Sequence, residues 1–147
     1  TLIRLGGLTR QQRQLAGALN LERRVLPAGP VTDEVLAALY AASDALAQPS
    51  RAEGFGIPVV EAMACGLPVV TSDGGALPEV AGEAGVVVPL VRPGAANRFA
   101  EALAAASAPS PSRRQLVDRG IARAASYSPE VVIPMLRDAY ARAGGSV

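Results

Sequence analysis

Residues 49–68 read PSRAEGFGIPVVEAMACGLP, and this stretch decides the fold. Pro58 suits the first turn of a helix, where its missing N–H would have no intrahelical partner. We therefore predict a helix that begins near Ile57. The backbone N–H groups from Gly54 to Ile57 would then point outward at the positive end of the helix dipole, which favours an anionic group such as phosphate.

Two carboxylates flank this predicted helix start. Glu53 lies in the glycine-bearing loop, and Glu61 lies eight positions later, one turn into the helix. A helix terminus that attracts phosphate, next to carboxylates that accept hydrogen bonds from hydroxyls, suits a ligand that is part phosphate and part sugar. A plainer interpretation also exists for each acid: Glu61 could face solvent, and Glu53 could serve the helix dipole from the loop.

The rest of the chain alternates between strand and helix patterns. We expect strands at residues 2–5, 25–28, 45–48, 68–71 and 86–88. We expect helical segments after the caps Thr9 and Thr32, from Ile57 to 64, and at residues 77–80, 95–106, 112–125 and 129–143. This alternation predicts an α/β fold, with a parallel sheet flanked by helices and a helical C-terminal tail. In such sheets ligands bind at the carboxyl ends of strands, so the loops at 49–56 and 72–76 are candidates for one crevice.

The stretch at 49–68 resembles the signature of GT-B fold, retaining glycosyltransferases of the family 4 type, the glycosyl transferases group 1. Their pattern is EGFGxPxxEAMACGxPVV, in which seven residues separate two Glu, the E-x7-E motif. The resemblance continues through residues 71–80 and 85–89, reaches back to residues 3–7, and covers most of the chain. It implies that residues 1–147 form one Rossmann-like, nucleotide-sugar-binding domain, the C-terminal half of a GT-B fold.

The resemblance also assigns roles to residues of the motif. Glu61 would bind the ribose hydroxyls of a nucleotide, and Glu53, the expected catalytic residue, would bind hydroxyls of the transferred sugar. Arg51 could reach the pyrophosphate or only hydrate the loop, and the sequence does not choose between the two. Ala28 and Gly29 are weaker candidates for backbone contacts with the base. The segment that approaches the sugar and the pyrophosphate would comprise Gly54, Phe55, Gly56 and Ile57.

The implied reaction transfers a sugar from a nucleoside-diphosphate sugar to a hydroxyl of a sugar, lipid or small molecule, with retention of the anomeric configuration. No metal and no cofactor within the chain are expected. The family places its acceptor in an N-terminal half, and this chain resembles the family only from the second strand of the donor domain onward. We therefore expect a fragment that does not turn over alone. Two alternatives stay open: a nucleotide-sugar-binding module without catalysis, and a GT-B epimerase or phosphorylase relative.

The amino-acid composition further limits the classes of protein and of active-site chemistry to which this chain can belong. The chain has 147 residues, 50% of them apolar and 18% charged, which suits one globular domain. Its net charge of +1 gives no field that would attract nucleic acid. Without His or Lys, the chain holds no imidazole base, Schiff-base lysine or Walker lysine. The single cysteine, Cys65, can form no internal disulfide, which fits the reducing cytoplasm as the expected location. For a longer enzyme that contains this chain, a peripheral position at the inner membrane face is the alternative.

Other side chains are expected to serve the fold rather than the ligand. Asp73 and Glu79 are expected to cap the short helix at 77–80. Expected in the core are Met63, Cys65, Tyr127 and Tyr140. Expected on a solvated helix face are Arg113, Arg114, Arg119 and Arg123. No apolar run reaches the roughly 18 residues of a membrane-spanning helix.

Overall fold

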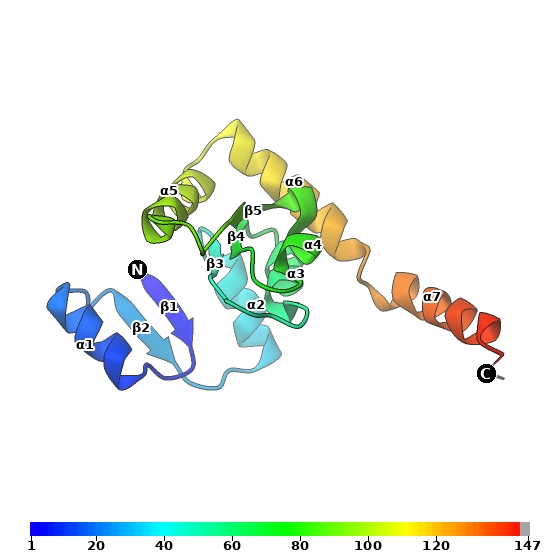
Figure 1. Ribbon diagram of the computed structural model, residues 1–147, viewed down its shortest axis with the longest axis horizontal. Helices are drawn as coiled ribbons and strands as arrows, with labels where there is room; N and C mark the ends of the chain where they lie inside the picture. The colour runs from blue at the N-terminus through cyan, green and yellow to red at the C-terminus, as the bar shows by residue number, and fades with distance from the viewer. Residues whose placement is uncertain (145–147) are drawn as a thin grey trace. The chain divides into compact units, whose positions relative to one another are not determined.

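The computed structural model describes residues 1–144 and divides the chain into two compact units (Figure 1). The first unit is Thr1–Leu36, and the second begins at Ala37. Each unit has its own parallel sheet: β1 pairs with β2 in the first, and the strand order is β3, β4, β5 in the second. The predicted α/β class, with parallel strands flanked by helices, is confirmed.

Most helix and strand ends lie within about one residue of the prediction, which is the usual uncertainty of such boundaries. In chain order the elements are β1 (Leu2–Leu5), α1 (Arg10–Ala18), β2 (Val25–Ala28), α2 (Asp33–Ala41), β3 (Leu46–Gln48), α3 (Ile57–Ala64), β4 (Val69–Ser72), α4 (Leu77–Ala81), the 3-10 helix η1 (Gly82–Ala84), β5 (Gly85–Val88), α5 (Ala95–Ser107), α6 (Pro111–Ala125) and α7 (Pro129–Arg142).

The first unit is held largely by local hydrogen bonds. Thr9 caps α1: its hydroxyl accepts from the Gln12 N–H at 3.2 Å, and the Gln12 side chain accepts from the Thr9 N–H at 2.9 Å. This is the predicted capping box. β1 and β2 then pair with Leu2 opposite Val25. Ala16 is the one buried residue within Thr1–Leu36.

The second unit is built around β4, whose four residues are all buried. Successive side chains of a strand point to opposite faces, so Val69 and Val70 meet different helices. Val70 packs in a cluster with Phe99 of α5. On the other face, a Cβ added to Gly85 would lie 2.8 Å from Val69 and 3.0 Å from Ala81 of α4. Helices thus cover both faces, as a parallel sheet requires (Figure 1).

α6 packs against α3, and the contact lies at Gly120, where an added Cβ would be 3.4 Å from Met63. Met63 is 1% exposed, which confirms its place in the core, whereas Cys65 is half-buried.

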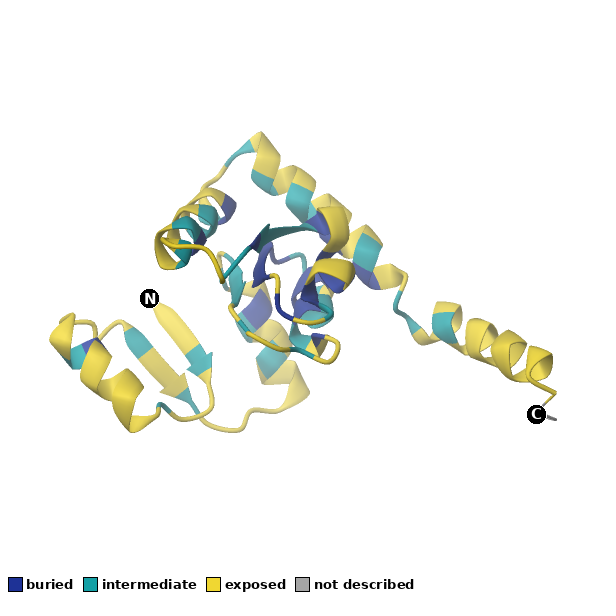
Figure 2. Cartoon of the chain, in the orientation of Figure 1, coloured by how far each residue is buried: buried dark blue, intermediate teal, exposed yellow. Residues whose placement is uncertain are grey.

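α7 forms the predicted helical tail but buries none of its residues (Figure 2). Tyr140 is therefore 63% exposed, and the prediction that it packs in the core is wrong. Within residues 1–144, no helix combines the length and the apolar composition needed to cross a membrane.

Candidate functional site

The candidate site centres on the loop that joins β3 to α3. α3 begins at Ile57, as predicted, and Gly56 precedes it with a left-handed φ of 100°. A Cβ at Gly56 would also lie 2.9 Å from a methyl group of Leu77. Both the dihedral angle and the close approach call for glycine at this position. The sequence EGFG therefore sets the sharp turn that starts α3.

Four backbone N–H groups are left open by this turn. Within residues 1–144, the N–H groups of Gly54, Phe55, Gly56 and Ile57 donate to no protein acceptor; Gly56 itself is buried, and the other three residues are exposed. Such groups at a helix N-terminus need an acceptor from solvent or from a ligand, and the helix dipole favours an anion there. The predicted start of α3 is thus present in the structure, and its affinity for an anion stays a prediction.

Glu53 lies half-buried at the base of the same loop. Its Oε2 accepts hydrogen bonds from Gln48 Nε2 at 3.1 Å and from the Ser50 hydroxyl at 3.2 Å. Gln48 Nε2 also donates to the Ser50 hydroxyl at 3.1 Å. These three side chains form a network in which one carboxylate oxygen is fixed and the other, Oε1, has no partner among the described residues. Gln48 and Ser50 were not predicted as site residues, although their places shortly before Glu53, at the end of a strand, were a usable signal.

A second loop, from Ser72 to Ala76, locks the first in place. The Ser72 hydroxyl donates to the Ser50 carbonyl, and the Ala76 N–H donates to the Glu53 carbonyl at 3.0 Å. Gly75 has a left-handed φ of 60°, and an added Cβ would lie 2.2 Å from the Glu53 carbonyl oxygen. The loops that follow β3 and β4 are therefore in direct contact, as expected of loops at the carboxyl ends of adjacent parallel strands.

Asp73 serves this region differently from the prediction. Its Oδ1 accepts from the Leu90 N–H at 3.0 Å, and α4 begins without a side-chain cap. The expectation that Asp73 and Glu79 cap α4 is wrong. Asp73 instead connects the loop after β4 to Leu90, two residues beyond the end of β5. This hydrogen bond restrains the second loop.

Glu61 lies on α3 with a partner that the sequence did not reveal. The Tyr40 hydroxyl on α2 donates to Glu61 Oε2 at 3.1 Å. Tyr40 is 7% exposed, and burial raises the pKa of its phenol, with the negative charge of Glu61 and the hydrogen bond adding to the effect. Tyr40 thus stays neutral and holds one oxygen of Glu61. Glu53 and Glu61 share no hydrogen-bond partner, so each is oriented separately.

Phe55 projects from the loop toward the end of α6. Its ring lies 5.4 Å from that of Tyr127, at an interplanar angle of 87°. Arg123 donates to the Tyr127 hydroxyl and to the carbonyls of Glu79 and Val80. Arg123 is therefore an exception to the mostly solvated arginine face that was predicted, because it donates to the C-terminal carbonyls of α4.

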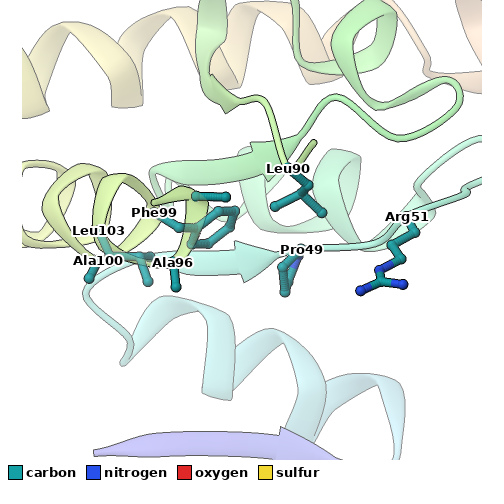
Figure 3. Close-up of a pocket in the computed structure, with 8 residues that line it drawn as sticks. Pro49, Arg51, Leu90, Ala96, Phe99, Ala100 and Leu103 are labelled. Carbon is teal, nitrogen blue, oxygen red and sulfur yellow. The ribbon is translucent and has the colours of Figure 1, made fainter. Parts of the chain in front are cut away.

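Arg51 lines a pocket of about 520 Å³ in the second unit. Arg51 and Leu103 lie at opposite ends of this pocket (Figure 3). The wall is otherwise mainly apolar, formed by Pro49, Leu90, Ala95, Ala96, Phe99, Ala100 and Leu103. Of the residues predicted to bind the nucleotide sugar, Arg51 alone lines this pocket. Ala28 and Gly29, the candidates for base contacts, lie in the first unit at the end of β2. In residues 1–144, no three His, Cys, Asp or Glu side chains come together as a metal site would require.

A parallel sheet between helices, with an open helix terminus beyond its strand ends, defines the class: the Rossmann-like C-terminal half of a GT-B fold. The chain belongs to the family of glycosyl transferases group 1, whose model matches residues 1–108. This confirms the resemblance on which the site residues were assigned. A search among curated proteins found no match.

Solved structures agree with the family. The chain is similar to sucrose-phosphate synthase from Thermosynechococcus elongatus, with 30% identity, a TM-score of 0.81, and coverage of 96% of this chain and 38% of that one. It is similar to HepE from Anabaena, solved in complex with UDP-glucose, with 27% identity, a TM-score of 0.78, and coverage of 98% and 41%. The C-terminal domain of the group 1 protein LpcC from Francisella tularensis matches with 25% identity, a TM-score of 0.67, and coverage of 80% and 60%.

Proposed function

We propose that this chain is the donor-binding domain of a retaining glycosyltransferase and holds a nucleoside-diphosphate sugar at the start of α3. The observation that carries the proposal is the row of open N–H groups from Gly54 to Ile57, flanked by Glu53 and Glu61. Membership of the glycosyl transferases group 1 supports it, as does the UDP-glucose bound to HepE.

The two acids suit hydroxyl groups on either side of a diphosphate. Tyr40 holds Oε2 of Glu61, which leaves Oε1 for the ribose hydroxyls. Gln48 and Ser50 hold Oε2 of Glu53, which leaves Oε1 for a hydroxyl of the transferred sugar. Because one oxygen of each carboxylate is already fixed, the other is oriented before the ligand arrives, and less side-chain entropy is lost on binding.

During transfer, the bond between the anomeric carbon and the diphosphate breaks. Positive charge develops on the sugar, and negative charge develops on the leaving diphosphate. The N–H groups of residues 54–57 and the dipole of α3 would stabilise that negative charge where it forms. Arg51, exposed in the same loop, is the candidate for a further contact with the pyrophosphate. Retention requires the acceptor oxygen to bond on the face that the diphosphate leaves, and the acceptor's hydroxyl proton passes to the departing diphosphate.

The chain spans 38% of the length of the sucrose-phosphate synthase and 41% of HepE. We therefore assign donor binding to it and place the hydroxyl acceptor on the part of the relatives that it does not match. Residues 1–147 alone are expected to bind donor without transferring sugar. A cytoplasmic location stays a prediction.

Calorimetry with UDP, GDP and ADP and with UDP-glucose, GDP-glucose and ADP-glucose tests the proposal. The unaltered chain should bind at least one of the sugar nucleotides. Glu61→Ala should weaken the matching nucleotide and sugar nucleotide alike, by about ten- to a hundredfold, the loss of a charge-assisted hydrogen bond. Glu53→Ala should weaken the sugar nucleotide and leave the nucleotide itself unchanged, since its oxygen faces the sugar.

Glu101→Ala is the matched control, because Glu101 is exposed on α5 and outside the loop. Equal donor binding by all three variants and the unaltered chain would contradict the assignment. A longer protein containing this chain that binds donor but transfers nothing would be a nucleotide-sugar-binding module. Phosphate-dependent cleavage of a glycan by that protein would indicate a phosphorylase.

A further inference from the structure

The turn between α6 and α7 contacts the loop that we assign to the donor. Tyr127 lies in this turn, half-buried, and meets the Phe55 ring edge to face. Phe55 itself is 43% exposed. Edge-to-face packing is a preferred aromatic geometry, worth more than the buried area alone. The Tyr127 ring therefore limits the positions that Phe55, and with it the loop backbone, can adopt.

Arg123 fixes Tyr127 and α4 together. Its Nη2 donates to the Tyr127 hydroxyl at 2.8 Å, and its guanidinium carbon lies 5.1 Å from the centre of the Tyr127 ring. Nη2 also donates to the Glu79 carbonyl at 2.6 Å, and Nε donates to the Val80 carbonyl at 3.2 Å. These carbonyls belong to the last turn of a helix, where partners within the helix are missing and a cation is favoured.

α4 supports the same loop from a second direction. Leu77, its first residue, packs against Gly56, and the preceding Ala76 N–H donates to the Glu53 carbonyl. Arg123 is thus connected to the loop by two routes, one through the Tyr127 ring to Phe55 and one through α4 to Gly56. Both routes end on the residues whose N–H groups are open.

We infer that Arg123 and Tyr127 are positioning residues, which hold Phe55 and Gly56 so that the N–H groups of residues 54–57 stay aligned for an anionic donor. Neither side chain belongs to the E-x7-E motif. The role in donor binding rests on the proposed function, whereas the effect on loop order can be measured without any ligand.

Amide hydrogen exchange, followed by NMR, gives that ligand-free measurement. The Val59 N–H donates to the Gly56 carbonyl, and the Ala76 N–H donates to the Glu53 carbonyl, so both amides exchange when the loop opens. In Tyr127→Leu, these two amides should exchange about three- to tenfold faster, the loss expected for an aromatic pair. The amide of Val70, in the central strand, should not change.

Three further variants make the test specific. Tyr127→Phe removes the hydroxyl that accepts from Arg123 but keeps the ring. It should leave both amides within about twofold of the unaltered chain, because the edge-to-face contact with Phe55 and the contact of the Arg123 guanidinium with the ring both remain. Phe55→Leu removes the other ring at an exposed position and should reproduce the faster exchange even if Tyr127→Leu does not fold. Tyr140→Leu is the matched control, since Tyr140 is exposed on α7, and it should change neither amide.

Donor affinity is measured on the same samples by calorimetry with UDP-glucose, GDP-glucose and ADP-glucose. Tyr127→Leu should weaken binding by about three- to tenfold, and Tyr127→Phe should restore it. Unchanged exchange at Val59 and Ala76 in both Tyr127→Leu and Phe55→Leu would overturn the inference. So would equal acceleration at Val70, which would mark a purely structural contact. Faster loop exchange with no binding of any donor by any sample would support the positioning effect and contradict the proposed function.

Discussion

The two parallel sheets of this chain differ sharply in burial. In the second unit, Val69, Val70 and Thr71 of β4 are fully buried. In the first unit, Leu2 of β1 is 50% exposed and Ile3 is 44% exposed (Figure 2). A parallel sheet is normally covered on both faces, and only the second unit meets this condition with its own helices. The difference teaches that the stability of the described chain, and the rigidity of its candidate site, depend on the second unit.

Gly75→Ala should have the largest effect, because it breaks the contact between the two loops of the better-packed unit. The new Cβ would meet the Glu53 carbonyl oxygen at 2.2 Å, and the backbone there has a positive φ. We expect a loss of about 3 kcal/mol in the free energy of unfolding, measured by urea denaturation. Gly54→Ala, which adds a Cβ in open space, should change it by less than about 1 kcal/mol. Equal losses in the two variants would show that the loops are not locked.

A matched pair of valines compares the sheets directly. Val70→Ala removes two methyl groups from a fully buried position of β4 and should lower the free energy of unfolding by about 2 to 3 kcal/mol. Val25→Ala, at a half-buried position of β2, should cost less than about 1 kcal/mol. Tyrosine fluorescence reports the first change, because Tyr40, Tyr127 and Tyr140 all lie in the second unit. Exchange of the Gly6 amide, which donates to the Ala28 carbonyl, reports the second. Similar costs at both positions would remove the contrast.

Two threonines should respond to one substitution with opposite signs. The Thr71 hydroxyl is fully buried and has no hydrogen-bond partner among the described residues, so Thr71→Val should stabilise the second unit by about 1 kcal/mol. Thr9→Val removes the cap of α1 and should destabilise the first unit by about 1 kcal/mol. Thermal melting followed by circular dichroism would measure both. A loss of stability in Thr71→Val would indicate a partner for the hydroxyl.

The smallest effect is expected from Tyr40 and is confined to alkaline pH. Burial and Glu61 raise its pKa in the folded state, so the folded state binds the proton more tightly than the unfolded state. The contribution of this group to stability is complete below the unfolded pKa of about 10 and decreases as the pH rises beyond it. Absorbance at tyrosinate wavelengths should show a late-titrating component that Tyr40→Phe removes. Its persistence in that variant would assign it to another residue.

The fold was largely predictable because its signals are local. The Thr9 and Gln12 capping box, Pro58 in the first turn of α3 and the glycine before Ile57 each act within a few residues. Tyr140 misled the prediction because an amphipathic pattern cannot say whether a partner is present to cover the helix.

The site was predictable only in its centre. The open N–H groups and the two acids follow from the motif, but the partners that orient them come from distant positions. Tyr40 is 21 residues from Glu61, and Arg123 is 43 residues from Val80. Asp73 likewise bonds Leu90 rather than its own helix. Sequence spacing carries no information on such contacts, since they depend on how helices pack over the sheet.

The contact between α3 and α6 has a consequence for biosynthesis. Met63 packs against Gly120, so the face of α3 that contacts α6 stays uncovered until the ribosome has added the roughly 50 residues that lead to α6. At about 5 to 20 residues per second, this interval lasts roughly 3 to 10 seconds. The nascent chain therefore passes through a period in which the apolar face of α3 that later packs on α6 is exposed.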